Sequence, residues 1–269
     1  MIIVFVGVCG RAVSLAQDPK PQSNKAVTVE LARGVSLKMA RIPKGKFWMG
    51  SPANEADRDP DDEKQREVEI TNEFYMGICE VSQGQWKAVM GEGNNPSHFR
   101  GDDLPVETVS WDDAKNFILK LNASKKVKSL LFRLPTEAEW EYACRGGAAS
   151  KDSEPFHFKD GPAATPTTNR ANFHGNYPYP DTAAKGIYRA KTTPVGSFEA
   201  NRFGLFDMHG NVAEWCEDLY SPGAAKHVYR GGSYGDGGVF CRAASRLADN
   251  PDSRKDYLGF RLAASLSQD

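Results

Sequence analysis

The second half of this chain contains little helical or strand-like periodicity, and this restricts the folds that the sequence can adopt. From about residue 150 to residue 192, the chain is rich in turn-forming residues, as in "ANFHGNYPYP" at Ala171–Pro180. Loops of this length are uncommon in a compact domain unless they are ordered by specific contacts. We therefore expect one α+β domain of low secondary-structure content, with loops held by side chains or by a bound ion.

Three short helices are expected in the first half, and each begins at a capping residue. Ser82 precedes "QGQWKAVMG", Ser110 precedes "WDDAKNFILKLN", and Thr136 precedes "EAEWEYACRGG". Asp113 and Glu139 follow the second and third of these caps at the spacing of a capping box. The second helix would place five apolar residues on one face: Trp111, Ala114, Phe117, Ile118 and Leu121.

Strands are expected on both sides of these helices. The segment Met39–Ser51, "MARIPKGKFWMGS", has two apolar runs around a Pro-Lys-Gly turn and predicts a β-hairpin. The acidic run Asn54–Glu67 is interpreted as a solvated loop. Alternating residues in "VEITNEFYMGICEVS" predict another strand, and "VYRGGSY" and "YLGFRLAAS" predict two near the C-terminus.

The N-terminal segment differs in composition from the rest of the chain. An apolar run, "MIIVFVGVCG", is followed by Ser14 and Ala16 at the −3 and −1 positions of a cleavage site, as in a secretory signal peptide. We predict a signal peptide at 1–16, a flexible leader at 17–34 and a single domain at 35–266, in a protein exported to the periplasm, the cell envelope or the medium. A buried first strand and a lipid anchor on Cys9 are the alternatives.

Charge and cysteine content exclude some classes of protein. The formal net charge is −1, and the basic residues are spread along the chain, so no concentrated basic face for nucleic acid is expected. No run reaches the roughly 20 apolar residues of a membrane-spanning helix. Four cysteines remain after a cleavage at Ala16: Cys79, Cys144, Cys216 and Cys241. They form either two disulfides or buried free thiols.

One loop has the composition of a calcium site. The stretch "DMHGNVAEWCED" places oxygen-bearing side chains around Gly210, namely Asp207, Asn211, Glu214, Glu217 and Asp218. Calcium takes six to eight oxygen ligands on bent backbone, although an acidic surface turn has the same composition. The five histidines show no paired metal-ligand spacing and are interpreted as loop or surface residues.

Seven motifs in a fixed order identify a family. They are "IPKGKFWMGS", "EVSQGQW", "PVETVSWDDA", "FRLPTEAEWEYACRGG", "NRFGLFDMHGNVAEWCED", "YRGGSY" and "LGFRLA". From about Val35 to Ala264 the chain resembles the formylglycine-generating enzymes, also called sulfatase-modifying factors. The resemblance implies a variant C-type-lectin-like fold. It also implies structural calcium and the copper- and oxygen-dependent oxidation of a cysteine in the Cys-x-Pro-x-Arg motif of a sulfatase.

The copper site that the resemblance implies is incomplete in this sequence. The family holds copper with two cysteines in "RGGSYxCxxxxC", because thiolates suit Cu(I). Here these positions carry Asp236 and Cys241, while Ser233 matches an active-site serine. Gly237 and Ala213 replace a family histidine and tryptophan. Copper is therefore not expected to bind, and Cys241 has an alternative role in the core or in a bond to Cys144.

The implied calcium ligands are better preserved. They fall on Asp207, Gly210, Val212 and Glu214, with the two middle residues contributing backbone carbonyls. A second family calcium site would begin at Asn172 and Phe173, but its acidic partner falls near Lys185.

These features favour a non-catalytic member of the family, which binds a polypeptide such as a sulfatase, or another envelope ligand, in the substrate groove. The alternative is a formylglycine-generating oxidase that works without the thiolate pair. An iron-dependent sulfur oxidation of the kind found in ergothioneine synthesis would need a His-rich domain that this sequence does not show.

Overall fold

The structure is a computed structural model that describes residues 26–124 and 129–267. The predicted signal peptide lies outside these residues. The strands are β1 Val27–Ala32, β2 Val35–Ile42, β3 Gly45–Met49, β4 Arg66–Ile70, β5 Phe74–Gly77, β6 Leu130–Arg133, β7 Phe156–Phe158, β8 Gly161–Ala163, β9 Ala213–Leu219, β10 His227–Arg230, β11 Arg246–Asp249, β12 Leu258–Gly259 and β13 Ala263–Leu266. The helices are α1 Gln83–Met90, α2 Trp111–Ala123, α3 Glu137–Cys144 and the short 3₁₀ helix η1 Gly238–Cys241.

The three predicted helices are confirmed, together with their caps. Ser82, Ser110 and Thr136 each accept a hydrogen bond from the backbone N–H three residues later, and a side chain at that third position accepts one in return. These reciprocal bonds satisfy N–H groups that have no partner within the helix. The apolar face of α2 is confirmed for Ala114, Phe117, Ile118 and Leu121, which are buried, whereas Trp111 is only partly buried.

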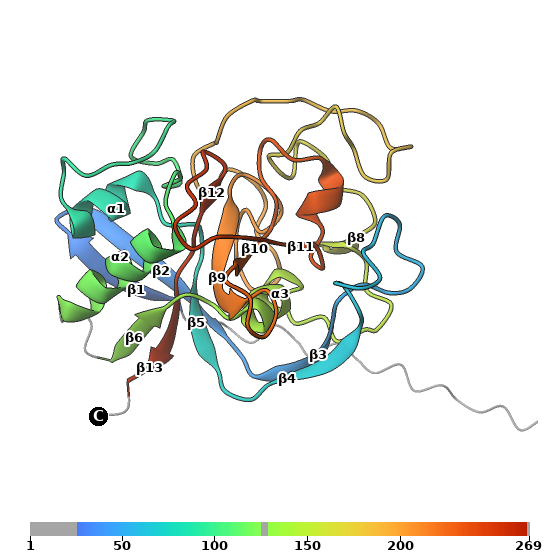
Figure 1. Cartoon of the computed structure of the whole chain (residues 1–269), viewed down its shortest axis with the longest axis horizontal. Coiled ribbons are helices and arrows are strands. Elements are labelled where there is room, and N and C mark those ends of the chain that lie inside the picture. Colours follow the sequence, from blue (N-terminus) through green and yellow to red (C-terminus); the bar gives the residue numbers. More distant parts are fainter. Residues whose placement is uncertain (1–25, 125–128, 268–269) are drawn as a thin grey trace, which may run out of the picture.

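The strands form a five-stranded sheet, a four-stranded sheet and two short pairs. The larger sheet has the order β1-β2-β5-β13-β6, and the four-stranded sheet has the order β11-β10-β9-β12. Because β13 pairs with both β5 and β6, the C-terminal part of the chain closes the sheet that its N-terminal part begins. Figure 1 shows this sheet beside α1 and α2, with the loops between β8 and β9 on the opposite side of the molecule.

The predicted hairpin at Met39–Ser51 is wrong. β2 pairs with β1 and β5, whereas β3 pairs with β4. Pro43 lies between β2 and β3 and has no N–H to donate to a ladder. Ile42 and Phe47 are nevertheless buried in the same apolar cluster, so the chain passes from one sheet to the next instead of folding back on itself.

The leader predicted at 17–34 needs a similar correction. β1 lies within that segment and pairs with β2 in the register Val29↔Leu37. Val29 and Leu31 are buried, so this part of the predicted leader belongs to the folded domain. The alternating polar residues Thr28 and Glu30 are exposed, as expected for a strand with one buried face.

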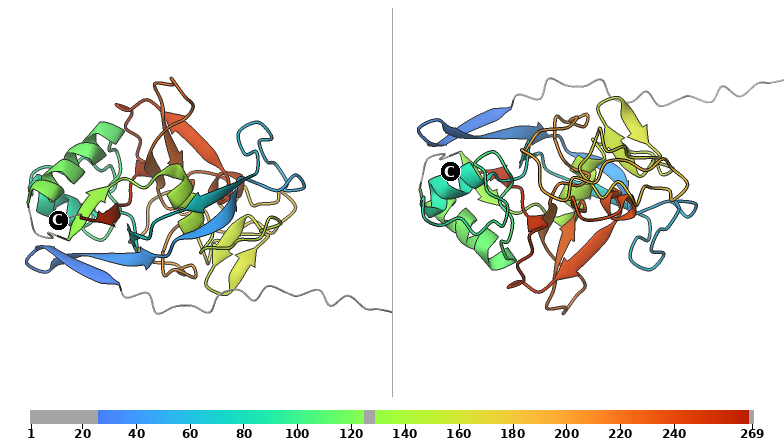
Figure 2. Two further views of the ribbon diagram at one scale, coloured as in Figure 1. Left: turned by 90° about the horizontal axis from the view of Figure 1, so that it is seen from below. Right: turned by 90° about the horizontal axis from the view of Figure 1, so that it is seen from above.

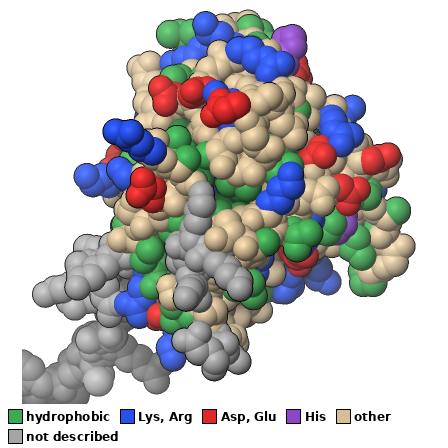
Figure 3. Space-filling view, turned by 90° about the vertical axis from the view of Figure 1, so that its left-hand side faces the viewer, with side chains coloured by type: hydrophobic (Ala, Val, Ile, Leu, Met, Phe, Trp, Pro, Cys, Tyr) green, Lys and Arg blue, Asp and Glu red, His purple; other side chains and the backbone are tan. Residues whose placement is uncertain are grey.

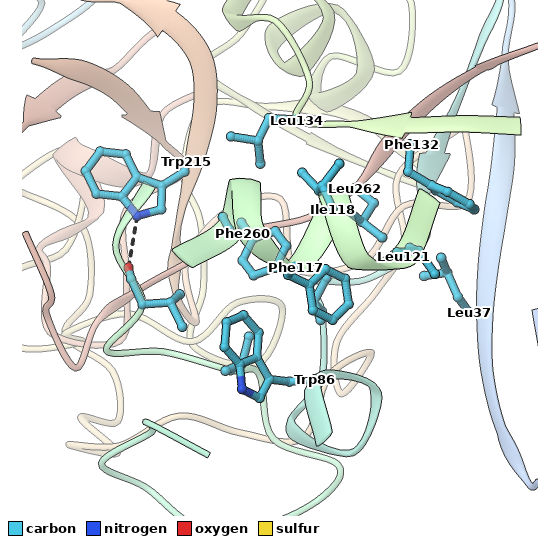
Figure 4. Close-up of a cluster of buried hydrophobic side chains, with 14 of the residues drawn as sticks. Leu37, Trp86, Phe117, Ile118, Leu121, Phe132, Leu134, Trp215, Phe260 and Leu262 are labelled. Atoms are coloured by element: carbon cyan, nitrogen blue, oxygen red, sulfur yellow. Dashed lines mark hydrogen bonds between the residues drawn. The ribbon is translucent and has the colours of Figure 1, made fainter. Parts of the chain in front are cut away.

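The main core lies between the five-stranded sheet and the pair of helices α1 and α2, which Figure 2 shows together on one side of β1 and β2. Trp86 of α1 stacks on Phe117 of α2 with ring centroids 5.4 Å apart, and Phe117 meets Phe260 edge-on at 5.5 Å. Figure 4 shows these rings together with Trp215, whose indole N–H donates to the carbonyl of Val109. A second core surrounds α3, where Trp140, Ala143 and Cys144 are fully buried.

Figure 3 shows one side of the molecule, where basic and acidic side chains are interspersed. The described residues on this side do not form a concentrated basic face. Within the described ranges, no helix combines the length and apolar character that a membrane crossing requires.

Candidate functional site

The segment after β10 brings Ser233 and Asp236 together. Gly232 has a φ of +63°, and a Cβ atom there would lie 2.7 Å from the sulfur of Cys241, so a side chain at this position would clash. The Ser233 hydroxyl donates to Asp236 Oδ2 at 2.6 Å, and the Asp236 carbonyl accepts from the N–H of His174 at 2.8 Å. Asp236 is partly buried, and this burial raises the pKa of its carboxyl.

Cys241, the second residue of the candidate catalytic pair, is a core residue. It ends η1 and is fully buried in a cluster with Phe156, Phe158 and Phe173. Its thiol contacts the carbonyl of Gly237 at 3.8 Å. Burial raises the pKa of the Cys241 thiol, so the reactive thiolate form is disfavoured.

Cys144 and Cys241 are linked through a histidine and not through a disulfide. The four cysteines that the structure describes are free thiols. His209 lies 3.7 Å from the Cys144 sulfur through Nε2, and its Nδ1 lies 2.8 Å from the carbonyl of Cys241. Nε2 also accepts from the N–H of His157, so Nδ1 must carry the proton and donate.

His209 and His157 correct the interpretation of the histidines as loop or surface residues. Both are buried, and burial lowers the pKa of His209 to about 4. They are neutral core groups, because a charged imidazole loses its hydration on burial.

Exposed apolar side chains lie on the segments that adjoin the Ser233–Asp236 turn. Tyr177, Ile187, Tyr188 and Phe240 are exposed, and we call these four residues the Tyr177 surface. His174 stacks on Tyr188 with ring centroids 3.6 Å apart and meets Tyr177 edge-on at 4.6 Å. The N–H of Gly238, in η1, donates to the carbonyl of Tyr177. These contacts tie the loop of residues 174–188 to the Ser233–Asp236 turn.

Two buried carboxylates lie at the loop that was predicted to bind calcium, one within it and one in the segment after β5. Glu80 and Asp207 are 1% and 7% exposed, and their two carboxyl side chains lie within hydrogen-bond reach of each other. Among the described residues, no N–H or hydroxyl group donates to Glu80 Oε2 or Asp207 Oδ1. Burial raises the pKa of both carboxyls, and the nearby charge of Asp207 raises that of Glu80 further. Unpaired buried carboxylate oxygens are costly and are normally compensated by a donor or a cation.

The backbone of the loop of residues 207–211 adopts uncommon conformations. Asp207, Gly210 and Asn211 all have positive φ, and a Cβ on Gly210 would lie 2.4 Å from the carbonyl oxygen of Asn172. Non-glycine residues at positive φ are uncommon and cluster at functional sites. The Asn211 amide donates to Glu80 Oε1 at 2.9 Å, which joins the loop to Glu80.

Glu214, a predicted calcium ligand, already has partners within the protein. Its carboxylate accepts two bonds of 2.6 Å from Arg261 and one of 2.7 Å from the Trp140 indole. All three side chains are fully buried. The Glu214 charge is therefore already neutralised by Arg261, and Oε1, which accepts one of these three bonds, keeps a lone pair that a calcium ion could use.

Asn172 and Phe173 have separate environments. The Asn172 amide donates to Asn211 Oδ1 at 3.2 Å, and its own Oδ1 is buried without a partner. Phe173 packs beside Cys241 in the small aromatic cluster. Asn172 thus belongs to the same polar network as Glu80, through Asn211.

The donor set fits a hard cation in chemical type. Two carboxylates and one amide carry buried oxygens to which no N–H or hydroxyl group of the described residues donates, and such oxygens are the ligands that calcium prefers. Within the described part of the chain, no group of three or more His, Cys, Asp or Glu residues is placed to hold a metal, so carbonyl or amide oxygens would have to complete the set. Glu80, the first residue of the motif "EVSQGQW", was not predicted as part of this site.

The acidic run Asn54–Glu67 is only partly solvated, contrary to its interpretation as a solvated loop. Glu55 and Glu63 lie on the two sides of Arg242, with contacts of 2.6 Å and 2.7 Å, and all three side chains are at most 4% exposed. One side of this group faces a cavity of about 650 Å³ that is lined by both basic and acidic residues, among them Arg246 and Asp62.

Comparison with known proteins identifies the family. The sequence model of the protein family described as "Sulfatase-modifying factor enzyme 1-like domain" matches residues 25–266 of this chain. This chain belongs to the sulfatase-modifying factor family. The formylglycine-generating enzyme of Streptomyces coelicolor is 39% identical over 180 residues, which cover 59% of this chain and 52% of that protein.

A second relative is the inactive C-alpha-formylglycine-generating enzyme 2 of Mus musculus, 36% identical over 196 residues that cover 70% of this chain and 57% of that protein. The chain thus spans little more than half the length of these two curated relatives. Among solved structures, PvdO from Pseudomonas aeruginosa is 28% identical with a TM-score of 0.72, and the match covers 89% of this chain and 98% of that one. The predicted family and fold are confirmed.

Of the residues predicted for the catalytic site, the fold joins Ser233 to Asp236 and places Cys241 in the core. A two-thiolate copper site therefore does not fit these residues. Of the predicted calcium residues, Asp207 and Gly210 lie in the loop beside Glu80, whereas Glu214 is paired with Arg261.

Proposed function

We propose that this protein is a non-catalytic, polypeptide-binding member of the sulfatase-modifying factor family. The observation that supports this most is the Asp236/Cys241 pair. Asp236 accepts the Ser233 hydroxyl, and Cys241 is a buried thiol with a raised pKa. A carboxylate is a hard ligand that holds Cu(I) poorly, and one buried thiol cannot form a two-sulfur site.

The Tyr177 surface is the proposed contact area for the polypeptide. Its exposed aromatic rings offer large, rigid contact areas, a property that is typical of binding hot spots. The half-buried carboxylate of Asp236 lies beside the Tyr177 surface. It would favour a polypeptide with a basic side chain close to the apolar side chain that contacts this surface. A sulfatase segment with the Cys-x-Pro-x-Arg motif has this composition, and it is the first partner to test.

A formylglycine-generating oxidase is the second candidate. The 39% identity to the Streptomyces coelicolor enzyme supports it. This activity would need a mechanism that does not use a pair of thiolates. The two candidates differ in whether the peptide cysteine is chemically changed.

The decisive experiment incubates the reduced protein with one equivalent of Cu(I), a high-affinity chelator and a Cys-x-Pro-x-Arg peptide. We expect the chelator to remove the copper, and the peptide mass to stay unchanged. Peptide binding, measured by calorimetry, should weaken about tenfold in a Tyr177→Ala/Tyr188→Ala variant and remain unchanged in Leu119→Ala, which alters an exposed residue on α2. Retained copper together with a formylglycine product would establish the oxidase instead.

We also propose that calcium binds at Glu80 and Asp207 and supports the fold. When bound, the cation would neutralise the two carboxylates and coordinate their buried oxygens. Millimolar calcium is expected to raise the melting temperature by several degrees, since a ligand that binds only the folded state stabilises it.

The calcium effect should disappear in Glu80→Gln and in Asp207→Asn, but persist in Glu69→Gln, which changes an exposed carboxylate on β4. A calcium effect of equal size in all three variants would argue against this site.

Export of the protein is part of the same proposal, since the apolar segment and the Ser14 and Ala16 positions resemble a signal peptide. The mass of the protein recovered from the producing cells should correspond to a chain that begins at Gln17. A mass that includes residues 1–16 would contradict the cleavage.

A further inference from the structure

A second cavity lies apart from the Ser233–Asp236 turn. Its volume is about 240 Å³, and it is formed by the loop after β3, the loop before β7 and the Tyr179–Pro180 segment. Figure 1 shows the loop after β3 and the β7–β8 pair on the same side of the molecule. The Tyr179 hydroxyl donates to the carbonyl of Ala56 at 2.8 Å and so joins two walls of the cavity.

The charge of this cavity is one-sided. Among the described residues that line it, Glu55, Asp152 and Glu154 carry carboxylates and none is basic. Asp152 and Glu154 are exposed at its rim, and the Glu55 side chain is only 4% exposed. The potential in such a cleft favours a positively charged group.

The charge of Glu55 is not fully compensated. One guanidinium, that of Arg242, serves two carboxylates, since it holds both oxygens of Glu63 at 2.7 Å and Glu55 Oε1 at 2.6 Å. With all three groups ionised, these side chains carry one excess negative charge, while burial raises the pKa of Glu55 and the positive charge of Arg145 acts against that rise. Glu55 Oε2 is buried and accepts no hydrogen bond from the described residues. Such a carboxylate oxygen can still accept one more donor, and hydrogen bonds to charged groups are the strongest kind.

The remaining walls are suited to an alkyl chain. Pro52, Pro155, Pro180, Ala56, Ala164 and Tyr179 supply apolar surface. The volume is several times the share of about 30 Å³ that one water molecule takes in the liquid, so the space is too large for a bare metal ion alone. Methylene groups ending in an ammonium would fill it, in the way that lysine side chains cover apolar surface while their charged ends reach polar partners.

We propose that this cavity binds an alkylammonium group, such as a lysine side chain of a polypeptide. The methylene stem lies along the proline and tyrosine walls, the ammonium donates to Glu55, and Asp152 and Glu154 attract it at the rim. This site is separate from the Tyr177 surface, and its occupancy does not depend on the function proposed for that surface.

The test uses two matched ligands, Nα-acetyl-lysine-N-methylamide and its uncharged analogue Nα-acetyl-norleucine-N-methylamide. Each is titrated into the ¹⁵N-labelled protein, and amide shifts are followed by NMR. We expect the lysine compound to shift the amides of residues around the cavity, such as Ala56, Ser153 and Ala164. The norleucine compound should leave them in place. Equal shifts from both compounds, or no shifts from either, would overturn the proposal.

Variants separate the contributions of the carboxylates. Asp152→Asn/Glu154→Gln removes the rim charges without touching the Arg242 group and should weaken binding about fivefold, the effect of two exposed ion pairs. Glu55→Gln should weaken it at least tenfold. The matched control Glu69→Gln, on β4, should bind as the wild type does. An unchanged affinity in the rim variant, which retains the folded Arg242 group, would contradict the site.

Calcium chloride is the last arm of the experiment. If calcium shifts the same amides and displaces the lysine compound, the cavity is a metal site and the alkylammonium proposal is wrong. Calcium shifts confined to the region of Glu80 and Asp207 would leave the proposal in place.

Discussion

At the scale of single residues, the same side-chain type has different roles according to its partners. Glu214 and Glu217 lie close together in β9, yet Glu214 forms a fully buried pair with Arg261, whereas Glu217 pairs with Lys115 near the surface. Removing one partner of a buried pair leaves an uncompensated charge, but a surface pair is screened by water. Composition alone, which suggested calcium ligands for both, could not separate these roles.

Glu214→Ala is expected to lower the free energy of unfolding by about 3–5 kcal/mol, because it leaves the Arg261 guanidinium and the Trp140 indole without their shared acceptor. Glu217→Ala is the matched control and should cost less than about 1 kcal/mol. Urea unfolding of the two variants measures the difference. A similar, small effect in both would mean that the Arg261 pair contributes little to stability.

At the scale of elements, local capping explains where the helices begin, and a side-chain contact attaches one of them to the sheet. Thr136 caps α3, and Glu139 completes the capping box. Glu139 also holds Arg133 of β6 through two bonds of 2.6 Å and 2.7 Å. The first turn of α3 is thus connected to the edge of the five-stranded sheet.

Thr136→Ala is expected to destabilise the protein by about 1 kcal/mol, the usual cost of losing an N-cap side chain. Thr136→Ser keeps the hydroxyl and should retain most of the stability. Thermal unfolding of both variants provides the comparison. Equal losses in the serine and alanine variants would show that the methyl group matters and that the cap does not.

At the scale of the whole molecule, buried polar contacts replace regular structure in the second half of the chain. Arg230 donates to the carbonyls of Ala243, Ala244 and Ser245 and also contacts Glu141. His209 joins the β7 region to the segment at Cys241. Such contacts satisfy backbone groups that have no strand or helix partner. Because His209 is one of these buried groups, the stability of the whole domain should depend on its protonation.

His209 is expected to make the folded state less stable in acid. Its pKa is about 4 in the folded protein and 6.5 as the ordinary value, so between these pH values the unfolded chain binds the extra proton. The contribution of His209 to the free energy of unfolding is therefore fully present above pH 6.5 and decreases as the pH falls towards 4. From about pH 7.5 to pH 5 this loss amounts to about 2 kcal/mol.

The raised pKa values of Glu80 and Asp207 act in the opposite direction, so the comparison between variants isolates the histidine. His209→Gln should lose less stability than the wild type between these two pH values, although it starts from a lower value. His98→Gln, at an exposed position, should follow the wild type. Identical pH slopes for wild type and His209→Gln in urea unfolding would show that His209 is not the titrating group.

The amino-acid sequence by itself determined the features that depend on neighbouring residues. The three capped helices and the apolar face of α2 follow from contacts within a few positions of the chain. The family and its fold follow from the order of seven motifs. The sequence also shows Asp236 at the position where the family resemblance implies a cysteine, with Cys241 at the second such position.

Only the tertiary structure decided which distant residues meet. β2 and β3 join different sheets, Glu55 and Glu63 share Arg242, Glu80 lies beside Asp207, and Arg261 neutralises Glu214. The physical reason is that a charge or an apolar side chain is stabilised by whichever partner the packed core places next to it. For these residues that partner is distant in the sequence, so no local pattern of residues could identify it.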